Sequence, residues 1–155
     1  MDNHIHKYDM GVIGNCSYLA YINKQADIVW MCLPRFDSPF LFGSLLDKNK
    51  GGVFSVTPYH PVSGSNQYYL KNTNILITEF TTVSGSFRIT DYAPRFYQYD
   101  RYFRPQMLIR KIEPISGQPA ITVHCKPVGD YGAVEPEIVM GSNHIRYMHL
   151  SGSVR

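Results

Sequence analysis

Alternating apolar and polar residues predict that most of this chain forms β-strands, arranged in antiparallel pairs with short turns. Residues 17–22 and 28–33 are rich in apolar side chains and flank the polar segment 23–27, so we expect them to form a hairpin. Residues 28–33 are apolar on both faces, which is typical of a central strand covered on both sides. The sequence therefore predicts a core built around this second strand.

A second hairpin is predicted from residues 74–81 and 86–92, which flank a short Ser-Gly turn. In its second strand Phe87, Ile89 and Asp91 fall on one face, because side chains alternate along a strand. A carboxylate therefore shares a face with two apolar residues.

The remaining apolar segments complete an all-β fold. Residues 106–112 and 120–126 are expected to pair as a third hairpin across the loop 114–119. Residues 53–57 and 145–150 are expected to form further strands. Short strands at this spacing, with turn residues between them, favour an antiparallel β-sandwich.

One short helix is predicted over residues 40–47. Ser38 is placed to cap its N-terminus and Pro39 suits its first turn, while Gly51 and Gly52 would end it.

The last residues, 151–155, are typical of a tight turn followed by the beginning of a strand. A sheet cut at this point would expose unpaired backbone groups along an edge. We therefore expect residues 1–155 to be one β-sandwich domain, incomplete at its C-terminal end, of a longer protein. An open edge also predicts that copies of the chain associate into a homo-oligomer.

The composition is that of a folded globular domain. Of its 155 residues, 44% are hydrophobic and 14% aromatic, which argues against disorder. The formal net charge is only +3 and the basic residues are scattered, whereas a nucleic-acid footprint would be a cluster of Lys and Arg. No apolar run approaches the roughly 18 residues of a membrane span. We therefore expect neither a nucleic-acid nor a membrane partner.

The residues that commonly bind metals do not form a ligand pattern. Cys16, Cys32 and Cys125 each lie in an apolar or strand-like segment, which favours reduced thiols. His4 and His6 alternate near the N-terminus, but no carboxylate or cysteine follows at a supporting interval. We therefore predict no metal, no cofactor and a reducing, cytoplasmic location.

The segment 30–39 is the most distinctive stretch of the chain. An apolar strand ends in two prolines that bracket Arg35, Phe36 and Asp37. Proline fixes its own φ and restricts the residue before it, so these side chains are presented with little freedom. One interpretation is that Arg35 and Asp37 only pair with each other to stiffen a corner. The other is that the loop meets a neighbouring domain or ligand.

Carboxylates are the groups that glycoside hydrolysis needs, one as acid and one as base. Asp37, Asp91 and Asp130 lie in loops or at strand ends beside aromatic residues, but nothing in the sequence brings two of them together. The alternative is that each caps a turn or pairs with a nearby arginine, Asp37 with Arg35 and Asp91 with Arg95.

Residues 92–104, which begin with Tyr92, are rich in aromatic side chains with interleaved arginines. Such a surface binds sugars or single-stranded nucleic acid by stacking. Tyrosine and arginine are equally favoured where a loop packs onto a partner domain. We prefer the partner-domain interpretation.

A series of short motifs runs through residues 8–132. The longest are the segments 8–16 and 30–39. The shorter motifs, in chain order, are Gly51-Gly52-Val53-Phe54, Tyr69-Leu70 with Asn74-Ile75-Leu76, Thr90-Asp91-Tyr92-Ala93-Pro94, Ile109-Arg110-Lys111-Ile112-Glu113 with Gly117, and Lys126-Pro127 with Asp130-Tyr131-Gly132. Together they closely resemble the N-terminal region of glucoamylase/trehalase-like proteins of glycoside hydrolase family 15. Two residues depart from the family's pattern, since Lys111 and Pro114 stand where Arg and Gly are usual.

This resemblance implies a β-supersandwich domain that precedes an (α/α)₆ catalytic barrel in the same protein. In that family the acid and the base are glutamates of the barrel, so no catalytic residue is expected in this chain. The barrel is then the partner of the domain, and an α-glucoside substrate would be bound through the barrel. The residues expected at the rim of its active site or at the domain interface are Trp30, Arg35, Phe36, Asp37, Asp91 and Tyr92.

Three functions follow as hypotheses. The first is a non-catalytic module of an inverting α-glucoside hydrolase, which packs against the barrel and brings the loop 34–39 to the rim of its active site. The second is a free-standing carbohydrate-binding module that uses the aromatic residues of 92–104. The third is a hydrolase in its own right, acting through Asp37 with Asp91 or Asp130. The first is the interpretation we adopt.

Overall fold

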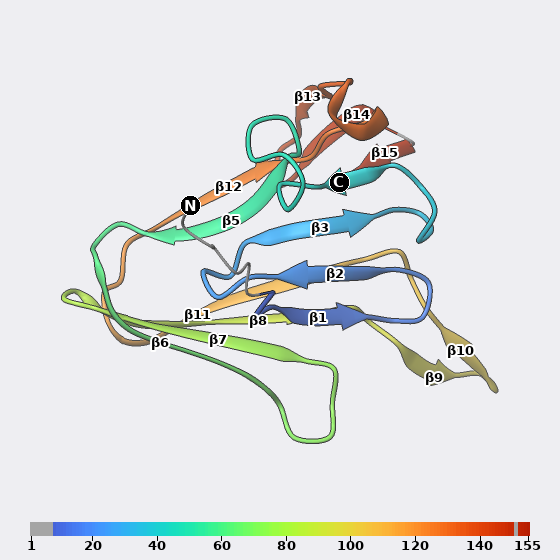
Figure 1. Ribbon diagram of the computed structural model, residues 1–155. Helices are drawn as coiled ribbons and strands as arrows, with labels where there is room; N and C mark the ends of the chain where they lie inside the picture. Colours follow the sequence, from blue (N-terminus) through green and yellow to red (C-terminus); the bar gives the residue numbers. More distant parts are fainter. Residues whose placement is uncertain (1–7, 151) are drawn as a thin grey trace, which may run out of the picture.

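The computed structural model describes residues 8–150 and 152–155, and it confirms an all-β, antiparallel, sandwich-like architecture (Figure 1). The larger sheet has the strand order β1-β2-β3-β5-β12, and β4 pairs with β3 beside this path. Its strands are β1 (Gly11–Gly14), β2 (Leu19–Ile22), β3 (Ile28–Cys32), β4 (Phe40–Phe42), β5 (Val53–Pro58) and β12 (Ile121–Lys126). The β2–β3 hairpin and the central place of β3 are as predicted.

The smaller sheet has the order β11-β8-β7-β6 and packs against the larger one. Its strands are β6 (Val62–Tyr69), β7 (Leu76–Thr82), β8 (Gly85–Tyr92) and β11 (Ile109–Gly117). The predicted β7–β8 hairpin is confirmed, and Phe87, Ile89 and Asp91 are all buried, as the alternation along β8 indicated.

Two smaller sheets and one short turn of helix complete the described chain. They are the pair β9 (Phe96–Gln98) and β10 (Arg101–Phe103), the three strands β13 (Glu137–Met140), β14 (Ile145–Leu150) and β15 (Gly152–Val154), and the 3₁₀ turn η1 (Asp130–Gly132). Figure 1 shows β13–β15 at the top, beside the β5–β12 edge, and the β9–β10 pair at the lower right of the molecule.

The core lies between the two main sheets. Ile13, Ile28 and Met31 from the larger sheet pack in one cluster with Phe87 and Ile89 from the smaller one. Each comes from an inward position of its strand, since side chains alternate between the faces of a sheet. Burial of such side chains is the main source of stability, at about 1.5–3 kcal/mol for each one.

The helix predicted over residues 40–47 is wrong. Phe40–Phe42 instead forms β4, antiparallel to β3, and all three of its residues are buried. The next residues make tight turns, closed by bonds from the Gly43 amide to the Gly51 carbonyl (2.6 Å) and from the Gly51 amide to the Asp47 carbonyl (2.8 Å). Pairing with the central strand buries more apolar surface here than an isolated helix would, and it overrides the local capping signal.

The predicted third hairpin is also wrong. β11 pairs with β8 in the smaller sheet, whereas β12 pairs with β5 in the larger one, so the chain crosses between the layers at residues 118–120. In addition, sequence reasoning did not identify β1, β6, β9, β10 or β13. In β6, seven of the eight residues are exposed, which leaves little apolar pattern to read.

Candidate functional site

The outward faces of β2 and β3 form an aromatic surface beside the loop 34–39, which we call the Trp30 face. It contains a shallow cavity of about 220 Å³. The residues that line it are Leu19, Tyr21, Trp30, Cys32 and Phe36. The Phe36 ring is 55% exposed although it belongs to this cluster. An outer sheet face built from aromatic rings is suited to stacking against a sugar or to packing against another domain.

Further rings extend the Trp30 face toward η1. The ring centroids of Trp30 and Phe40 lie 5.6 Å apart, and those of Phe40 and Tyr131 lie 5.7 Å apart in an edge-on arrangement. Tyr131 is 63% exposed and follows Asp130, which is also exposed. The loop 34–39 and η1 thus border one continuous series of aromatic side chains.

Arg35 and Asp37 form a bidentate ion pair at the tip of the loop. The Arg35 guanidinium donates to both carboxylate oxygens of Asp37, from Nε at 3.0 Å and from Nη2 at 3.3 Å. The prediction that they pair is confirmed. Because both side chains are more than 70% exposed, the pair contributes only about 0–1 kcal/mol and remains open to an approaching partner. Their assignment to an active-site rim remains a prediction.

Asp91 lies inside the sandwich, paired with Arg110 on the neighbouring strand. Arg110 Nε donates to Oδ1 of Asp91 at 2.7 Å and Nη2 donates to Oδ2 at 3.2 Å. The same guanidinium donates to the carbonyls of Phe54 (2.7 Å) and Ala26. The expected pairing of Asp91 with Arg95 is therefore wrong, because register places Arg110 directly opposite Asp91.

Burial raises the pKa of Asp91, while the charge and hydrogen bonds of Arg110 act in the opposite direction. Asp91 has no exposed surface, and within this chain it holds Arg110, whose guanidinium in turn reaches the carbonyls of the larger-sheet side. Tyr92, at the end of β8, is half-buried. The placement of both residues at a rim or an interface remains a prediction.

The three carboxylates considered for catalysis have separate surroundings. Asp37 is exposed in its loop, Asp91 is enclosed with Arg110, and Asp130 is exposed in η1. In the described part of the chain, no ion pair or hydrogen bond links any two of the three, and none of their side chains lines a cavity described here.

The residues that the structure describes contain neither a cluster of metal-ligating side chains nor a helix of membrane-spanning length. These residues contain no group of three or more His, Cys, Asp or Glu side chains that could hold a metal ion. His4 and His6 lie outside the described residues. No helix in the described ranges is long and apolar enough to cross a membrane.

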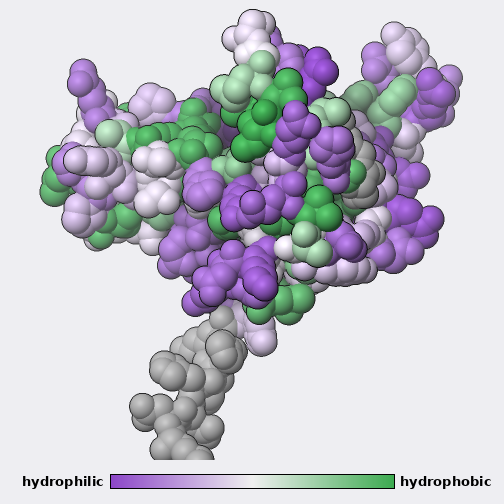
Figure 2. Space-filling view, turned by 90° about the horizontal axis from the view of Figure 1, so that it is seen from above, coloured by the Kyte–Doolittle hydropathy of each residue, from purple (hydrophilic) through white to green (hydrophobic). Residues whose placement is uncertain are grey.

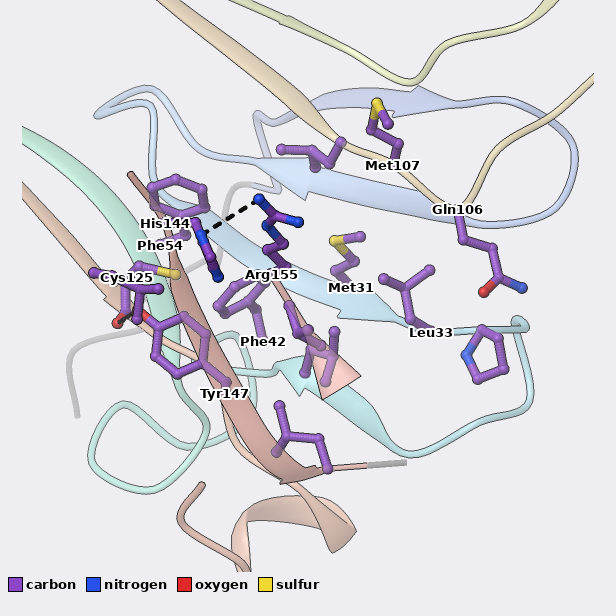
Figure 3. A pocket seen from close by; sticks show the side chains of 16 residues that line it. Met31, Leu33, Phe42, Phe54, Gln106, Met107, Cys125, His144, Tyr147 and Arg155 are labelled. Carbon is purple, nitrogen blue, oxygen red and sulfur yellow. Dashed lines mark hydrogen bonds between the residues drawn. The ribbon is translucent and has the colours of Figure 1, made fainter. Parts of the chain in front are cut away.

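A groove of about 650 Å³ opens between the layers, where β14 faces the segment 106–108 (Figure 3). Its walls are mainly apolar, with Phe42 and Phe54 contributed by the larger sheet and Tyr147 by β14. On one side of the groove, Arg155 donates a hydrogen bond to Nδ1 of His144 at 3.3 Å. Sequence reasoning missed this groove because its walls come from segments that lie far apart along the chain.

The aromatic segment 92–104 forms the β9–β10 pair, which stands away from both main sheets (Figure 1). Its tyrosines are largely exposed, with 60% of Tyr97, 80% of Tyr99 and 61% of Tyr102 accessible. Seen from above the view of Figure 1, hydrophobic side chains also lie in several separate patches among polar ones (Figure 2).

Comparison with known proteins gives a consistent match. Residues 3–153 match the family model described as trehalase-like, N-terminal. The chain is 37% identical over 131 residues to a trehalase of Thermoplasma volcanium, which covers 83% of this chain and 20% of that protein. It is 40% identical over 115 residues to a trehalase of Thermoplasma acidophilum, which covers 72% of this chain and 19% of that protein.

Trehalase 1 of Sulfolobus acidocaldarius is 31% identical over 140 residues, which is 90% of this chain and 23% of that protein. The chain thus spans about one fifth of the length of the curated relatives it matches. No solved structure gives a significant match.

Proposed function

Because this chain belongs to the trehalase-like N-terminal domain family, we propose that it is the non-catalytic β-sandwich module of an inverting α-glucoside hydrolase of the glucoamylase/trehalase type. In this proposal the module packs against an (α/α)₆ catalytic barrel of the same protein, which binds the α-glucoside. Its three cysteines are free thiols, which supports a reducing, cytoplasmic setting.

The proposal rests mainly on two observations: the family model covers nearly all of this chain, and this chain covers only a small part of each relative. The match to the family model covers nearly the whole chain, yet the chain accounts for only about one fifth of each relative named as a trehalase. The separate surroundings of Asp37, Asp91 and Asp130 support a non-catalytic role, because glycoside hydrolysis needs two carboxyl groups that flank one bond, roughly 5–9.5 Å apart.

The Trp30 face is the surface we assign to the barrel. It combines a shallow aromatic cavity with the stiff, exposed Arg35–Asp37 pair at its border. Aromatic residues and arginine are enriched at protein interfaces, and a bidentate ion pair gives a directional contact. The loop 34–39 would then reach the rim of the active site, where Arg35 and Asp37 can hydrogen-bond sugar hydroxyls or hold a barrel loop.

The test is a chimera in which this chain replaces the matched segment of the Thermoplasma acidophilum trehalase. We expect the chimera to release glucose from trehalose, and the isolated chain to release none from trehalose or maltose. In the chimera, Arg35→Ala should lower kcat/KM about tenfold, which corresponds to the loss of one charge-assisted hydrogen bond of roughly 1.5 kcal/mol.

The matched control is Lys111→Ala, which removes one member of the exposed Lys111–Glu113 pair on the smaller sheet. It should leave the kinetics unchanged. If the chimera is inactive while the parent trehalase is active, the proposed module function is wrong. It is also wrong if the isolated chain itself hydrolyses trehalose or maltose. Kinetics unaffected by Arg35→Ala would remove the loop from the rim and leave the module in place.

A second candidate is carbohydrate binding through the exposed tyrosines of the β9–β10 pair. Rings with this degree of exposure, interleaved with arginine, can stack on a sugar without a barrel. Calorimetry of the isolated chain with trehalose, maltose and longer α-glucans separates the two candidates. Binding that is lost in Tyr97→Ser would favour this one, and no binding leaves the module ahead.

A further inference from the structure

The strands β9 and β10 form an arm, residues 94–105, that is structurally separate from the sandwich. Among the described strands, β9 and β10 pair only with each other, in the register Phe96–Phe103, Tyr97–Tyr102 and Gln98–Arg101. Figure 1 shows the arm extending from one corner of the molecule, beyond the ends of both main sheets. The sandwich core therefore does not need this segment for its own packing.

The base of the arm is held by a buried amide. Asn15 is 1% exposed, and its side-chain Nδ2 donates to the carbonyls of Pro94 (3.1 Å) and Pro105 (2.8 Å), one at each end of the arm. Arg95 adds a bond from Nη1 to Sγ of Cys16 at 3.2 Å. An arm fixed in this way loses little conformational freedom when it binds, which favours affinity.

Each face of the arm carries its own aromatic pair. Phe96 and Phe103 stack on one face with ring centroids 5.4 Å apart, and Tyr97 and Tyr102 meet on the other at 5.0 Å. An arginine guanidinium lies over one ring of each pair, at 4.8 and 4.9 Å from the ring centroid. A flat partner surface would cover only one of these faces, whereas a cleft would cover both.

The tip of the arm places a large ring where a small residue is usual. Tyr99 and Asp100 have φ values of 51° and 57°, the left-handed conformation that hairpin turns normally give to Asn-Gly or Asp-Gly. Tyr99 is nevertheless 80% exposed, so within this chain its ring gains little from burial. Backbone strain of about 1–3 kcal/mol that is not repaid by packing is characteristic of binding segments.

The charge of the arm indicates the chemistry of its partner. Residues 94–105 contain three arginines, Arg95, Arg101 and Arg104, against the single acidic residue Asp100. Within the described residues none of these arginines forms an ion pair with a carboxylate. A complementary surface would therefore supply carboxylates, which arginine binds in bidentate fashion.

We infer that the β9–β10 arm inserts into a carboxylate-lined cleft at the mouth of the sugar-binding site of the catalytic domain. The inference rests on the proposed function, which supplies that domain. Glycoside hydrolases cleave their substrate between two carboxyl groups, so carboxylates lie within the cleft that such a mouth opens into. The rings of the arm would pack against the walls of the cleft, and its arginines would pair with carboxylates at the entrance.

Hydroxyl-radical footprinting of tyrosine tests this insertion directly. In the chimera, Tyr97, Tyr99 and Tyr102 should be oxidised at least about tenfold more slowly than in the isolated chain, because the centre of a docked interface excludes water. Tyr59 is 76% exposed in a turn of the sandwich body, and its rate should be the same in both proteins.

Two variants test the charge and the tip separately. Arg101→Glu should return the labelling of Tyr97 in the chimera to the rate of the isolated chain, whereas Lys111→Glu, on the smaller sheet, should not. A double variant, Tyr99→Asn with Asp100→Gly, gives the arm a favoured hairpin turn and so keeps it folded. It should nevertheless raise Tyr97 labelling, because the ring at the tip is gone.

The outcomes separate this inference from the proposed function. A chimera that hydrolyses trehalose but labels its arm like the isolated chain overturns the inference and leaves the module intact. If the isolated chain binds trehalose or maltose through Tyr97, the arm binds sugar and the inference is wrong. If light scattering shows a dimer that Arg101→Glu dissociates, the occupant is a second copy, and the inference is likewise overturned.

Discussion

Replacing Arg110 by Met removes the side chain that joins the two sheets most directly. Its guanidinium makes two hydrogen bonds to Asp91 in the smaller sheet and one each to the carbonyls of Phe54 and Ala26, which belong to β5 and the β2–β3 turn. The side chains of Arg110 and Asp91 are 3% and 0% exposed. Water therefore cannot replace these bonds when the guanidinium is removed.

The loss of one member of a buried ion pair costs about 3–5 kcal/mol, because the other charge remains buried without a partner. A single domain is usually stable by only about 5–15 kcal/mol. We therefore expect Arg110→Met to remove about a fifth or more of the free energy of unfolding at pH 7.

The stability deficit of Arg110→Met should also change with pH in a definite direction. Burial raises the pKa of Asp91, and Arg110 opposes that rise, so the pKa should increase further in Arg110→Met. A carboxyl group whose folded pKa exceeds its unfolded value of about 4 binds its proton more tightly in the folded state, so stability falls as the pH rises through that interval. The deficit of Arg110→Met relative to the unmodified protein should therefore shrink as the pH falls from 7 toward 5.

The assay is urea denaturation at pH 7 and pH 5, followed by the fluorescence of Trp30, the single tryptophan. The control is Arg88→Met, which breaks the Arg88–Glu79 pair on β8 and β7, where the side chains are 40% and 27% exposed. This control should cost less than about 1 kcal/mol. The reasoning is refuted if both variants lose the same small amount, or if the deficit of Arg110→Met grows on acidification.

Three further predictions concern the sandwich itself. Gly85→Ala should cost more than about 1 kcal/mol, because Gly85 has a φ of +140° and lies against the backbone of β11. Gly64→Ala should cost less, because a Cβ there makes only an ordinary contact with Thr81 at 3.9 Å; equal costs in thermal unfolding would contradict this. Phe87→Ala should cost about 3–5 kcal/mol in urea denaturation, since Phe87 is 1% exposed, and a loss below 1 kcal/mol would show that the core is not where we place it. A thiol reagent should modify exposed Cys16 much faster than Cys32, which is 7% exposed and whose thiol pKa is raised by burial; the opposite order would argue against the β3 packing.

Local patterning was sufficient for the hairpins β2–β3 and β7–β8, whose strands are neighbours in sequence. The alternation of Phe87, Ile89 and Asp91 identified both the strand β8 and its buried face, and the apolar run of β3 identified a central strand. It failed at β11 and β12, which lie on either side of a turn-like loop but belong to different sheets. Whether β11 pairs with β8 or with β12 depends on how each whole sheet is completed. The sequence of the loop between β11 and β12 carries no information about that.

The partner of Asp91 illustrates the same limit. Sequence proximity suggested Arg95, but β-sheet register brings Arg110 opposite Asp91, nineteen residues away. The signal was present in part, because a carboxylate that shares a face with Phe87 and Ile89 must be buried and needs a cation from an inward position of a neighbouring strand. For the β9–β10 arm, the sequence showed the aromatic residues and the arginines. It did not show that this segment stands apart from the two main sheets.

The Asp91–Arg110 pair also limits how this domain can evolve. A mutation at either position alone would pass through a protein with a lone charge sealed in its interior, so selection should reject most single replacements. Lineages that abandon the pair should therefore lose both members together, in exchange for apolar residues of matching volume. Where one member persists in a relative, the other should persist with it.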